Sequence, residues 1–185
     1  ARPGATTPRG GVVNPTLKGG AIAAARAALQ HLTDPEIPVV TLSDLGILRE
    51  VRTGSDGVTE VVITPTYSGC PAMGQIEDDV RAALRDAGIE ARVLTQLSPA
   101  WTTDWMGPDA REKLRAYGIA PPQGRATPAT DKVVGFMRSA ARQAVPCPQC
   151  GSSHTTETSP FGSTACKSMH RCLDCLEPFD HFKPY

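Results

Sequence analysis

The sequence is poor in aromatic residues and has no excess of either charge, which limits the partners that it can be expected to bind. Aromatic residues make up 5% of the 185 residues, and 19 basic side chains balance 19 acidic ones. Surfaces that bind nucleic acid or an anionic membrane generally carry a basic field, and single-stranded nucleic acid also needs aromatic stacking platforms. We therefore expect neither nucleic acid nor a membrane among the partners.

No part of the sequence reaches the roughly 20 consecutive apolar residues that a membrane-spanning helix requires. The most apolar stretch, residues 21–32, is interrupted by Arg26 and Gln30. The first residues also lack the charged-then-apolar layout of a secretory leader. We expect a cytoplasmic protein.

Several signatures of catalytic sites are missing as well. The sequence has no Gly-rich phosphate-binding loop, no His-x-x-x-His pair and no Glu-x-x-His pair of the kind that holds a di-iron centre. It therefore shows no redox or hydrolytic machinery of its own, and we expect no independent catalytic activity.

Cysteines, in contrast, are concentrated near the C-terminus, where five of the six fall within the last 39 residues. Four of them form two Cys-x-x-Cys pairs, Cys147 with Cys150 and Cys172 with Cys175. The stretch between the pairs is long enough for a β-hairpin that brings the two turns together. Four thiolates around one ion are typical of structural zinc, while iron accepts the same ligands. The pattern predicts a metal-binding ribbon, with disulfides or unbound thiols as the alternative.

The metal in this ribbon is expected to be structural, because four cysteines leave no open coordination position for catalysis. A segment of this size also builds a poor core alone, so the metal would supply much of its folding energy. Cys166 and His170 are spare candidates, and Cys166 is better explained as a buried or functional thiol than as a fifth ligand.

The order of predicted elements indicates an α/β protein: a small mixed α/β domain followed by a β ribbon. Helices are predicted at 21–32, 72–87 and 108–117, and strands at 47–52, 58–64 and 89–97. Composition divides the chain into four parts. These are a loose tail (1–19), the α/β domain (20–120), a linker with a short helix at 132–143 (121–145), and the ribbon (146–185).

Cys70 stands apart from the other cysteines, directly before Pro71 and the helix predicted at 72–87. A sulfur at the start of a helix meets unpaired N–H groups and the positive end of the helix dipole, which lowers the thiol pKa. This position predicts a reactive or metal-binding thiolate. The alternative is a small buried residue that packs the turn. Asp34 and Glu36 are candidate neighbours of Cys70, although their residue types also suit the end of a helix.

Three segments of the α/β domain and two of the ribbon form a combination of motifs. They are Asp34-Pro35-Glu36-Ile37-Pro38-Val39 with Asp44-Leu45-Gly46-Ile47, Thr64-Pro65-Thr66-Tyr67-Ser68-Gly69-Cys70-Pro71, Ser98-Pro99-Ala100-Trp101-Thr102-Thr103-Asp104-Trp105-Met106, and, in the ribbon, Phe161-Gly162-Ser163-Thr164-Ala165-Cys166-Lys167 with Glu177-Pro178-Phe179-Asp180. The first three resemble the iron–sulfur assembly domain shared by SufT-like proteins and the eukaryotic cytosolic iron–sulfur targeting factors. Together with the ribbon they resemble the PaaD family of phenylacetyl-CoA epoxidase accessory subunits.

The resemblance implies a bacterial protein of aerobic phenylacetate catabolism that works beside a di-iron oxygenase and an iron–sulfur flavin reductase. It implies that Cys70 is the functional thiol, holding iron or an iron–sulfur cluster transiently, with Asp34, Glu36 and Asp104 as candidate neighbours. The expected function is maturation of the metal centres of these partners. A structural subunit of the oxygenase complex and a thiol enzyme are the rival hypotheses, and a homo-oligomer stays open.

Overall fold

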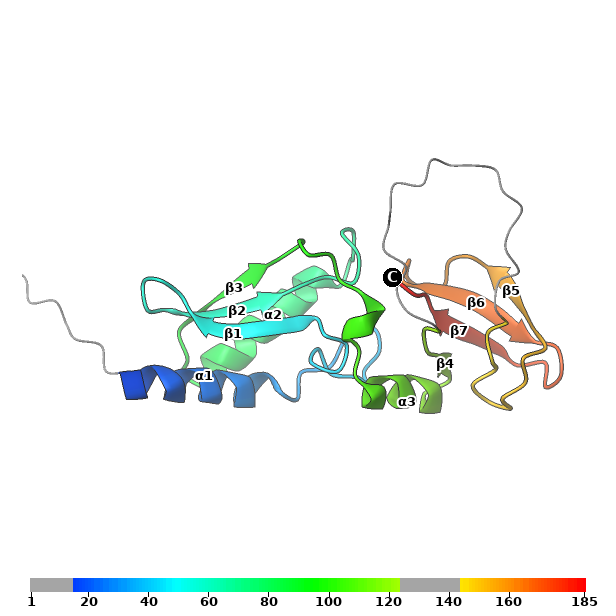
Figure 1. The fold of residues 1–185 in the computed structure, drawn as a ribbon, viewed down its shortest axis with the longest axis horizontal. Helices are drawn as coiled ribbons and strands as arrows, with labels where there is room; N and C mark the ends of the chain where they lie inside the picture. Colours follow the sequence, from blue (N-terminus) through cyan, green and yellow to red (C-terminus); the bar gives the residue numbers. More distant parts are fainter. Residues whose placement is uncertain (1–14, 124–143) are drawn as a thin grey trace, which may run out of the picture.

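The computed structural model describes residues 15–123 and 144–185. Within these ranges the chain forms two sheets of different size, joined by a short helix (Figure 1). The short helix predicted at 132–143, most of the linker and residues 1–14 of the predicted tail lie outside the described residues. Among the described helices, none has the length and apolar character that crossing a bilayer requires.

The first helix, α1 (Pro15–Leu29), begins earlier and ends earlier than predicted. Residues 15–19, expected in a loose tail, are its first turn, because a proline fits the first helical position, where its missing N–H is not needed. The helix gives way to a loop in which the Asp34 N–H donates to the Val40 carbonyl at 3.0 Å. Ala25 and Leu29 are buried and anchor α1 on the sheet.

The first sheet has the order β1-β2-β3, with β1 (Leu48–Thr53) antiparallel to β2 (Thr59–Ile63), and β2 parallel to β3 (Ala91–Thr95). The predicted hairpin between the first two strands is confirmed. Parallel pairing of β2 and β3 requires a crossover, which the predicted helix α2 (Met73–Asp86) supplies. Both helices contact the sheet and each other, so they cover the same face.

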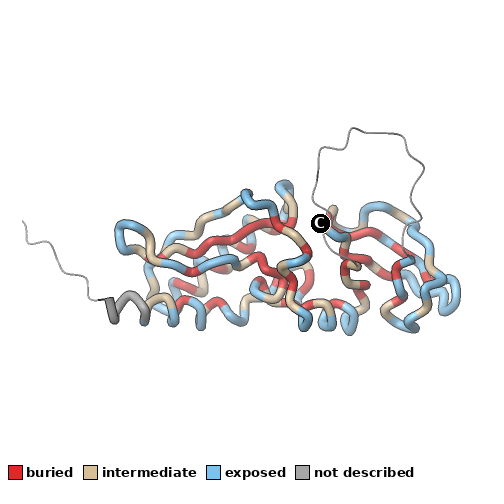
Figure 2. The backbone as a smooth tube through the Cα atoms, viewed as in Figure 1, coloured by how far each residue is buried: buried red, intermediate tan, exposed pale blue. Residues whose placement is uncertain are grey.

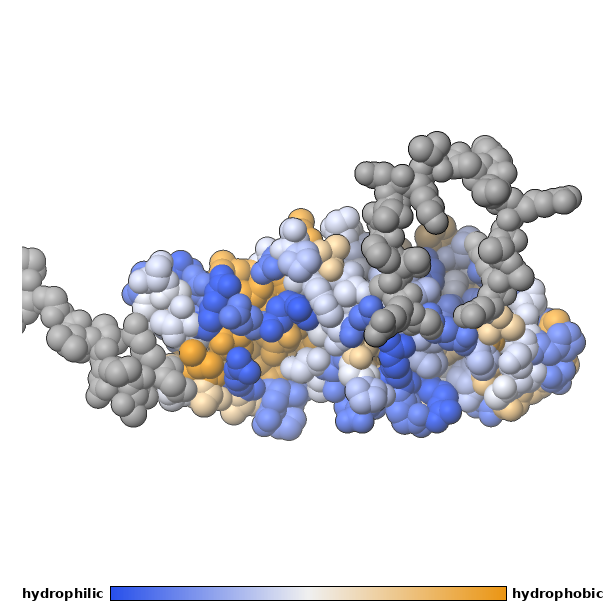
Figure 3. All heavy atoms as spheres, viewed as in Figure 1, coloured by the Kyte–Doolittle hydropathy of each residue, from blue (hydrophilic) through white to orange (hydrophobic). Residues whose placement is uncertain are grey.

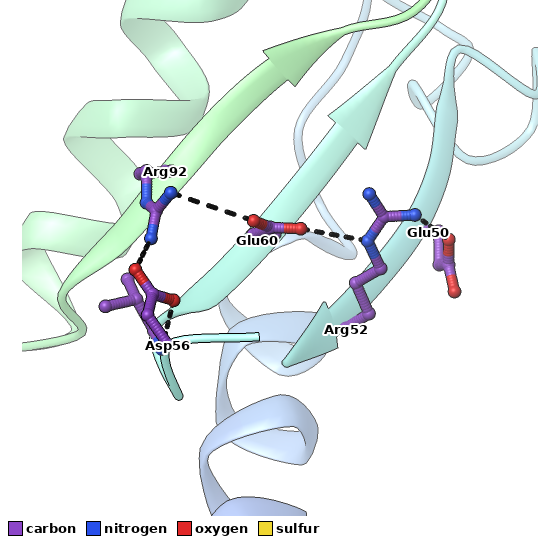
Figure 4. Close-up of polar contacts among 6 residues, drawn as sticks. Glu50, Arg52, Asp56, Glu60 and Arg92 are labelled. Atoms are coloured by element: carbon purple, nitrogen blue, oxygen red, sulfur yellow. Dashed lines mark hydrogen bonds and ion pairs between the residues drawn. The ribbon is translucent and has the colours of Figure 1, made fainter. Parts of the chain in front are cut away.

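A row of charged side chains crosses this sheet from strand to strand. Glu60 of β2 lies between Arg52 of β1, at 3.0 Å, and Arg92 of β3, at 3.9 Å (Figure 4). Arg52 also pairs with Glu50 at 3.1 Å, and Arg92 pairs with Asp56 of the hairpin turn. Exposed pairs of this kind contribute little stability each, and opposite charges on neighbouring strands are compatible with the observed register.

The second sheet has the order β4-β7-β6-β5 and contains the ribbon. Its three long strands, β5 (Thr155–Ser159), β6 (Lys167–Cys172) and β7 (Pro178–Phe182), form an antiparallel meander. The edge strand β4 (Ile119–Ala120) pairs in parallel with β7 and follows directly on α3 (Pro108–Ala116). A segment predicted to close the α/β domain therefore contributes a strand to the ribbon sheet.

The two parts of the chain share one hydrophobic core at their junction. The Trp101 ring packs at an angle of 52° against Phe182 of β7, with ring centroids 6.0 Å apart, and meets the Tyr185 ring edge-on at 6.3 Å. Tyr185, the C-terminal residue, also bonds to this region, because its carbonyl accepts a hydrogen bond from the Thr103 N–H at 3.2 Å. Buried backbone runs through both sheets in Figure 2, and the C-terminus lies at the junction between them. The ribbon is thus held against the α/β domain by packing as well as by β4.

The surface shown in Figure 3 has separate apolar and hydrophilic regions. Apolar residues gather where α1 meets the first sheet, while the region around α3 is hydrophilic. The apolar area adjoins a shallow pocket of about 530 Å³ that Ala23, Ala27, Leu48 and Val51 help to line.

Candidate functional site

The four ribbon cysteines converge as the spacing predicts. Their sulfur atoms all lie within 4.8 Å of one another, with 3.7 Å between the sulfurs of Cys147 and Cys175 and 3.6 Å between those of Cys150 and Cys172. Zinc–sulfur bonds of about 2.3 Å in a tetrahedron place the sulfurs about 3.8 Å apart. The cysteines therefore form a metal-binding site with dimensions that fit zinc, and the same four thiolates also accept iron.

Tight turns place these sulfurs. In the first turn the Gly151 N–H donates to the Cys147 carbonyl at 2.9 Å, and Gly151 has a φ of +76°, which glycine adopts without strain. In the second turn Leu176 takes a φ of +66°, and the Cys172 N–H donates to the Glu177 carbonyl at 3.0 Å. The Cys175 N–H points at the Cys172 sulfur, 3.5 Å away, and lowers the pKa of Cys172 to about 6. A bound ion would tie both turns together.

The separate core of the ribbon is small. That core holds five buried residues, of which two are metal-site cysteines: Ala120, Val145, Cys147, Cys172 and Phe179. An ion held by four protein sulfurs would add folding energy and would leave no open coordination position for a substrate.

Cys70 does not belong to the metal-site group of cysteines. It is half-buried in the turn between β2 and α2, and its carbonyl accepts from the Met73 N–H at 3.4 Å. The expectation of a lowered pKa is wrong. Because α2 begins only at Met73, burial outweighs the help of the Ala72 backbone N–H and raises the pKa of the Cys70 thiol, and the neighbouring charge of Glu36 raises it further.

Asp34 and Glu36, two of the candidate neighbours of Cys70, lie in the loop that follows α1. Asp34 is buried, with 8% of its surface exposed, and its carboxylate accepts from the backbone N–H groups of Glu36 and Ile37, both at 2.9 Å. Burial raises the pKa of both carboxyl groups, and the charges of both act on Cys70. The charges of two acids in the loop that follows α1 therefore act on the thiol.

Asp104, the third candidate neighbour, is placed elsewhere. It lies exposed in the short 3-10 helix Thr103–Trp105, where its backbone N–H donates to the Thr102 hydroxyl at 3.3 Å. Its described contacts are with its own turn and not with Cys70.

Cys166, whose role the sequence did not determine, is a buried thiol of the ribbon. It lies in the loop that leads into β6, with 6% of its surface exposed, and its sulfur is 2.9 Å from the Thr164 hydroxyl. Burial raises the pKa of this thiol, as does the nearby Glu36. Burial raises the pKa of the Tyr67 hydroxyl, and the charges of Cys70 and Cys166 raise it further.

Lys167 brings a positive charge into the same region. It is 5% exposed, and its ammonium lies 3.5 Å from Asp180 of β7. Its charge also acts on Asp34, Glu36 and Cys166, where it offsets part of the rise in pKa that burial causes. Two thiols, two carboxylates and one lysine, drawn from the α/β domain and the ribbon, thus act on one another through their charges.

Comparisons with known proteins match both parts of the chain. Residues 22–94 match the family model described as an iron–sulfur cluster assembly protein, and residues 131–183 match the PaaD zinc beta ribbon domain. A protein from Escherichia coli (strain K12), named as a putative subunit of 1,2-phenylacetyl-CoA epoxidase, is 49% identical over 85% of this chain and 89% of its own.

Relatives of the first part alone are more distant. A protein from Porphyromonas gingivalis named Fe-S protein maturation auxiliary factor is 35% identical over 46% of this chain and 83% of its own. The crystal structure of a domain of unknown function, DUF59, from Bacillus anthracis is similar over 55% of this chain and 97% of that one, with 27% identity and a TM-score of 0.49. The extent of the match to the E. coli protein, which takes in both the assembly domain and the ribbon, shows that the chain belongs to the PaaD family of phenylacetyl-CoA epoxidase subunits.

Proposed function

We propose that the protein is an accessory factor of the phenylacetyl-CoA epoxidase system that delivers iron or an iron–sulfur cluster to its metal-containing subunits, with Cys70 as the carrier thiol. The observation that carries this proposal is a half-buried free cysteine, Cys70, in the turn between β2 and α2 of a domain that matches the iron–sulfur cluster assembly family. The relatives of that domain are named as maturation factors, and the relative of the whole chain is named as an epoxidase subunit.

The chemistry around Cys70 suits a cargo that is held briefly. Thiolate and carboxylate oxygen are both ligands of iron, and a half-buried cysteine can be reached by a partner's side chains. In the described residues, the ribbon cysteines are the group of three or more donors that lies within 4.8 Å. The looser arrangement around Cys70 would bind a metal less tightly than the ribbon does, which favours release to a client.

The ribbon takes a different role in this proposal. It carries zinc as a structural ion and presents a surface for docking. The clients are the di-iron oxygenase subunits and the iron–sulfur flavin reductase of the epoxidase system, in the cytoplasm. Delivery by ligand exchange needs no reaction catalysed by this chain itself.

A structural subunit of the oxygenase complex is the second candidate, and one observation favours it. The turn between β6 and β7 exposes Leu173 and Leu176, by 42% and 58%, beside the metal-site cysteines. Exposed leucines on a rigid turn are typical of a contact surface. This candidate predicts stable co-purification with the oxygenase and no requirement for Cys70.

Complementation separates the two candidates. Cells that lack this protein receive the wild type, Cys70→Ser or Ser68→Ala, the last a control at an exposed position of the same turn. We expect Cys70→Ser to leave the oxygenase and reductase poor in iron and inactive, and Ser68→Ala to restore both. Full metal content and activity with Cys70→Ser would overturn the carrier proposal and support the structural role. The zinc content of each purified variant shows that the ribbon is intact.

A further inference from the structure

We propose that a pocket on one face of the ribbon sheet binds a small organic carboxylate with an apolar, ring-sized body, and that His181 and Lys183 hold the carboxylate group. The pocket has a volume of about 690 Å³, within the range of about 300–1,000 Å³ that is typical of small-molecule sites. Neither Cys70 nor a metal-site cysteine is among the described residues that line it. The inference therefore does not depend on whether Cys70 carries iron.

The floor of the pocket is a polar face of the ribbon sheet. Side chains two residues apart on a strand share a face, so Ser168 and His170 of β6 point the same way. His181 of β7 is the register partner of Ser168, and Glu157 of β5 is the register partner of His170. These four residues line the pocket together with Lys183, which follows His181 by two residues. The topology thus gathers five polar side chains on one side of a small sheet.

Three of the floor residues form a buried polar group. The Ser168 hydroxyl lies 3.0 Å from Nε2 of His170 and 3.5 Å from Nδ1 of His181. The three residues are 2%, 6% and 8% exposed, in that order. The His170 ring also stacks on Phe179, with centroids 5.5 Å apart, and meets the His181 ring edge-on at 5.3 Å. The two imidazoles are therefore held in place before any ligand arrives, as a binding site requires.

One polar atom of this group has no partner. Among the described residues, nothing bonds to the buried Nε2 of His181. Buried polar atoms are nearly always hydrogen-bonded, so a ligand or water in the pocket is the natural partner of this one. Burial lowers the pKa of His181 to about 4, so the ring is neutral at neutral pH and carries one N–H. When Nδ1 accepts a hydrogen bond from the Ser168 hydroxyl, that N–H lies at Nε2 and can donate to a carboxylate.

Another part of the lining supplies a positive charge and apolar surface. The Lys183 ammonium donates to the Pro160 carbonyl at 3.1 Å and lies 4.6 Å from the centroid of the Phe161 ring. An ammonium has three donors, so it can bond to a ligand as well. Phe161 is 62% exposed, and Val145 and Pro184 extend the apolar lining. An ammonium beside an exposed aromatic ring suits a ligand that joins a carboxylate to an apolar body.

The charges of the pocket favour a monoanion. Glu157 lines the same pocket as Lys183, and the charges of both act on His181. A second negative charge on the ligand would be repelled by Glu157, which disfavours a dicarboxylate or a phosphate. A metal ion is a poorer fit than an organic anion. In the described part of the chain, the ribbon cysteines are the group of three or more donors close enough to share an ion.

Phenylacetate is the probe, and two related compounds separate the contributions of its parts. Phenylacetamide keeps the shape and removes the charge, whereas acetate keeps the charge and removes the apolar body. Isothermal titration calorimetry of the full-length, zinc-loaded protein measures the binding of each compound. We expect one saturable site for phenylacetate with a Kd below about 1 mM, binding of phenylacetamide that is weaker by about tenfold or more, and no measurable binding of acetate.

Lys183→Met and His181→Phe remove the two groups that contact the carboxylate and keep side chains of similar size. We expect each to weaken phenylacetate binding by about tenfold or more. Arg85→Met is the matched control, because it removes the same charge from an exposed position in the last turn of α2 and should leave binding unchanged. Unchanged binding in either pocket variant would overturn the proposal, as would equal binding of phenylacetate and phenylacetamide or the absence of saturable binding.

Because His181 is buried, its variant is first checked for zinc content and thermal unfolding. Should it fail to fold, NMR of the wild type decides. Bound phenylacetate should shift the imidazole nitrogen resonance of His181 Nε2 and give contacts between the ligand ring and Phe161 in nuclear Overhauser spectra. His181 resonances that do not respond to the ligand would show that Nε2 bonds to water only, and would overturn the proposal.

Discussion

Phe182→Ala tests whether the ribbon and the assembly domain unfold as one unit. Phe182 is 1% exposed and packs with Trp101 in a core made mostly of assembly-domain residues. An aromatic side chain buries about 150–250 Å², worth about 4–6 kcal/mol of transfer free energy as an upper limit. Measured Phe→Ala substitutions in cores cost about 3–5 kcal/mol. We expect the free energy of unfolding to fall by about 4 kcal/mol.

The assay is urea unfolding followed by two signals, the fluorescence of Trp101 and Trp105 and the release of ribbon zinc to a coloured chelator. With a slope of about 2 kcal/mol per molar urea, the midpoint should fall by about 2 M, and both signals should move together. Phe161→Ala is the control, because Phe161 is 62% exposed in the same part of the chain and should cost less than about 1 kcal/mol. A shift of zinc release alone, with the fluorescence midpoint unchanged, would refute the shared core.

Other predictions concern the backbone, a buried histidine and the metal. Gly46 has a φ of +71°, and an added Cβ would lie 2.9 Å from the Trp105 Cβ, so Gly46→Ala should lower the free energy of unfolding by about 1–3 kcal/mol. Gly20→Ala in α1, where the added Cβ would meet open space, should raise the free energy of unfolding by about 0.5–1 kcal/mol. Thermal unfolding measures both, and equal effects of the two substitutions would contradict strain at Gly46. Burial, with the nearby charge of His170, lowers the pKa of His181 from 6.5 to about 4. Between these pH values the unfolded state binds more protons than the folded state, so the free energy of unfolding should decrease by up to about 3 kcal/mol as pH falls from 6.5 to 4. His181→Gln should remove this part of the pH dependence in denaturant titrations, and an unchanged pH dependence would show that another group is responsible. Cys150→Ser leaves three ribbon thiolates and should weaken zinc binding at least tenfold in competition with a chelator, whereas Thr156→Ala on exposed β5 should not; equal affinities would contradict a four-cysteine site.

The sequence predicted the features that depend on local spacing. Two Cys-x-x-Cys pairs fix the turns of the ribbon, and the helical spacing of Ile76, Val80 and Leu84 gives the buried face of α2. The hairpin of β1 and β2 follows from two predicted strands on either side of a turn that contains Gly54 and Gly57. In each of these cases the residues that determine the structure are close together in the chain.

Features that depend on contacts between distant residues could not be predicted in this way. The burial of Cys166 in the core of the assembly domain depends on the junction at Trp101 and Phe182, which no local pattern reports. The two residues of β4 form a strand only because β7 offers an edge. The pKa of Cys70 rises because burial and Glu36 outweigh the helix start, and burial is a property of the whole fold.

The most direct test of the carrier role is transfer of iron between purified proteins. The full-length chain, with zinc in its ribbon, is loaded with iron-57 and mixed with the metal-free reductase of the epoxidase system, and the iron in each protein is then measured after separation. The account predicts that the wild type passes iron to the reductase and restores its activity, while Cys70→Ser neither retains iron nor transfers it. Equal transfer by Cys70→Ser would contradict the central claim.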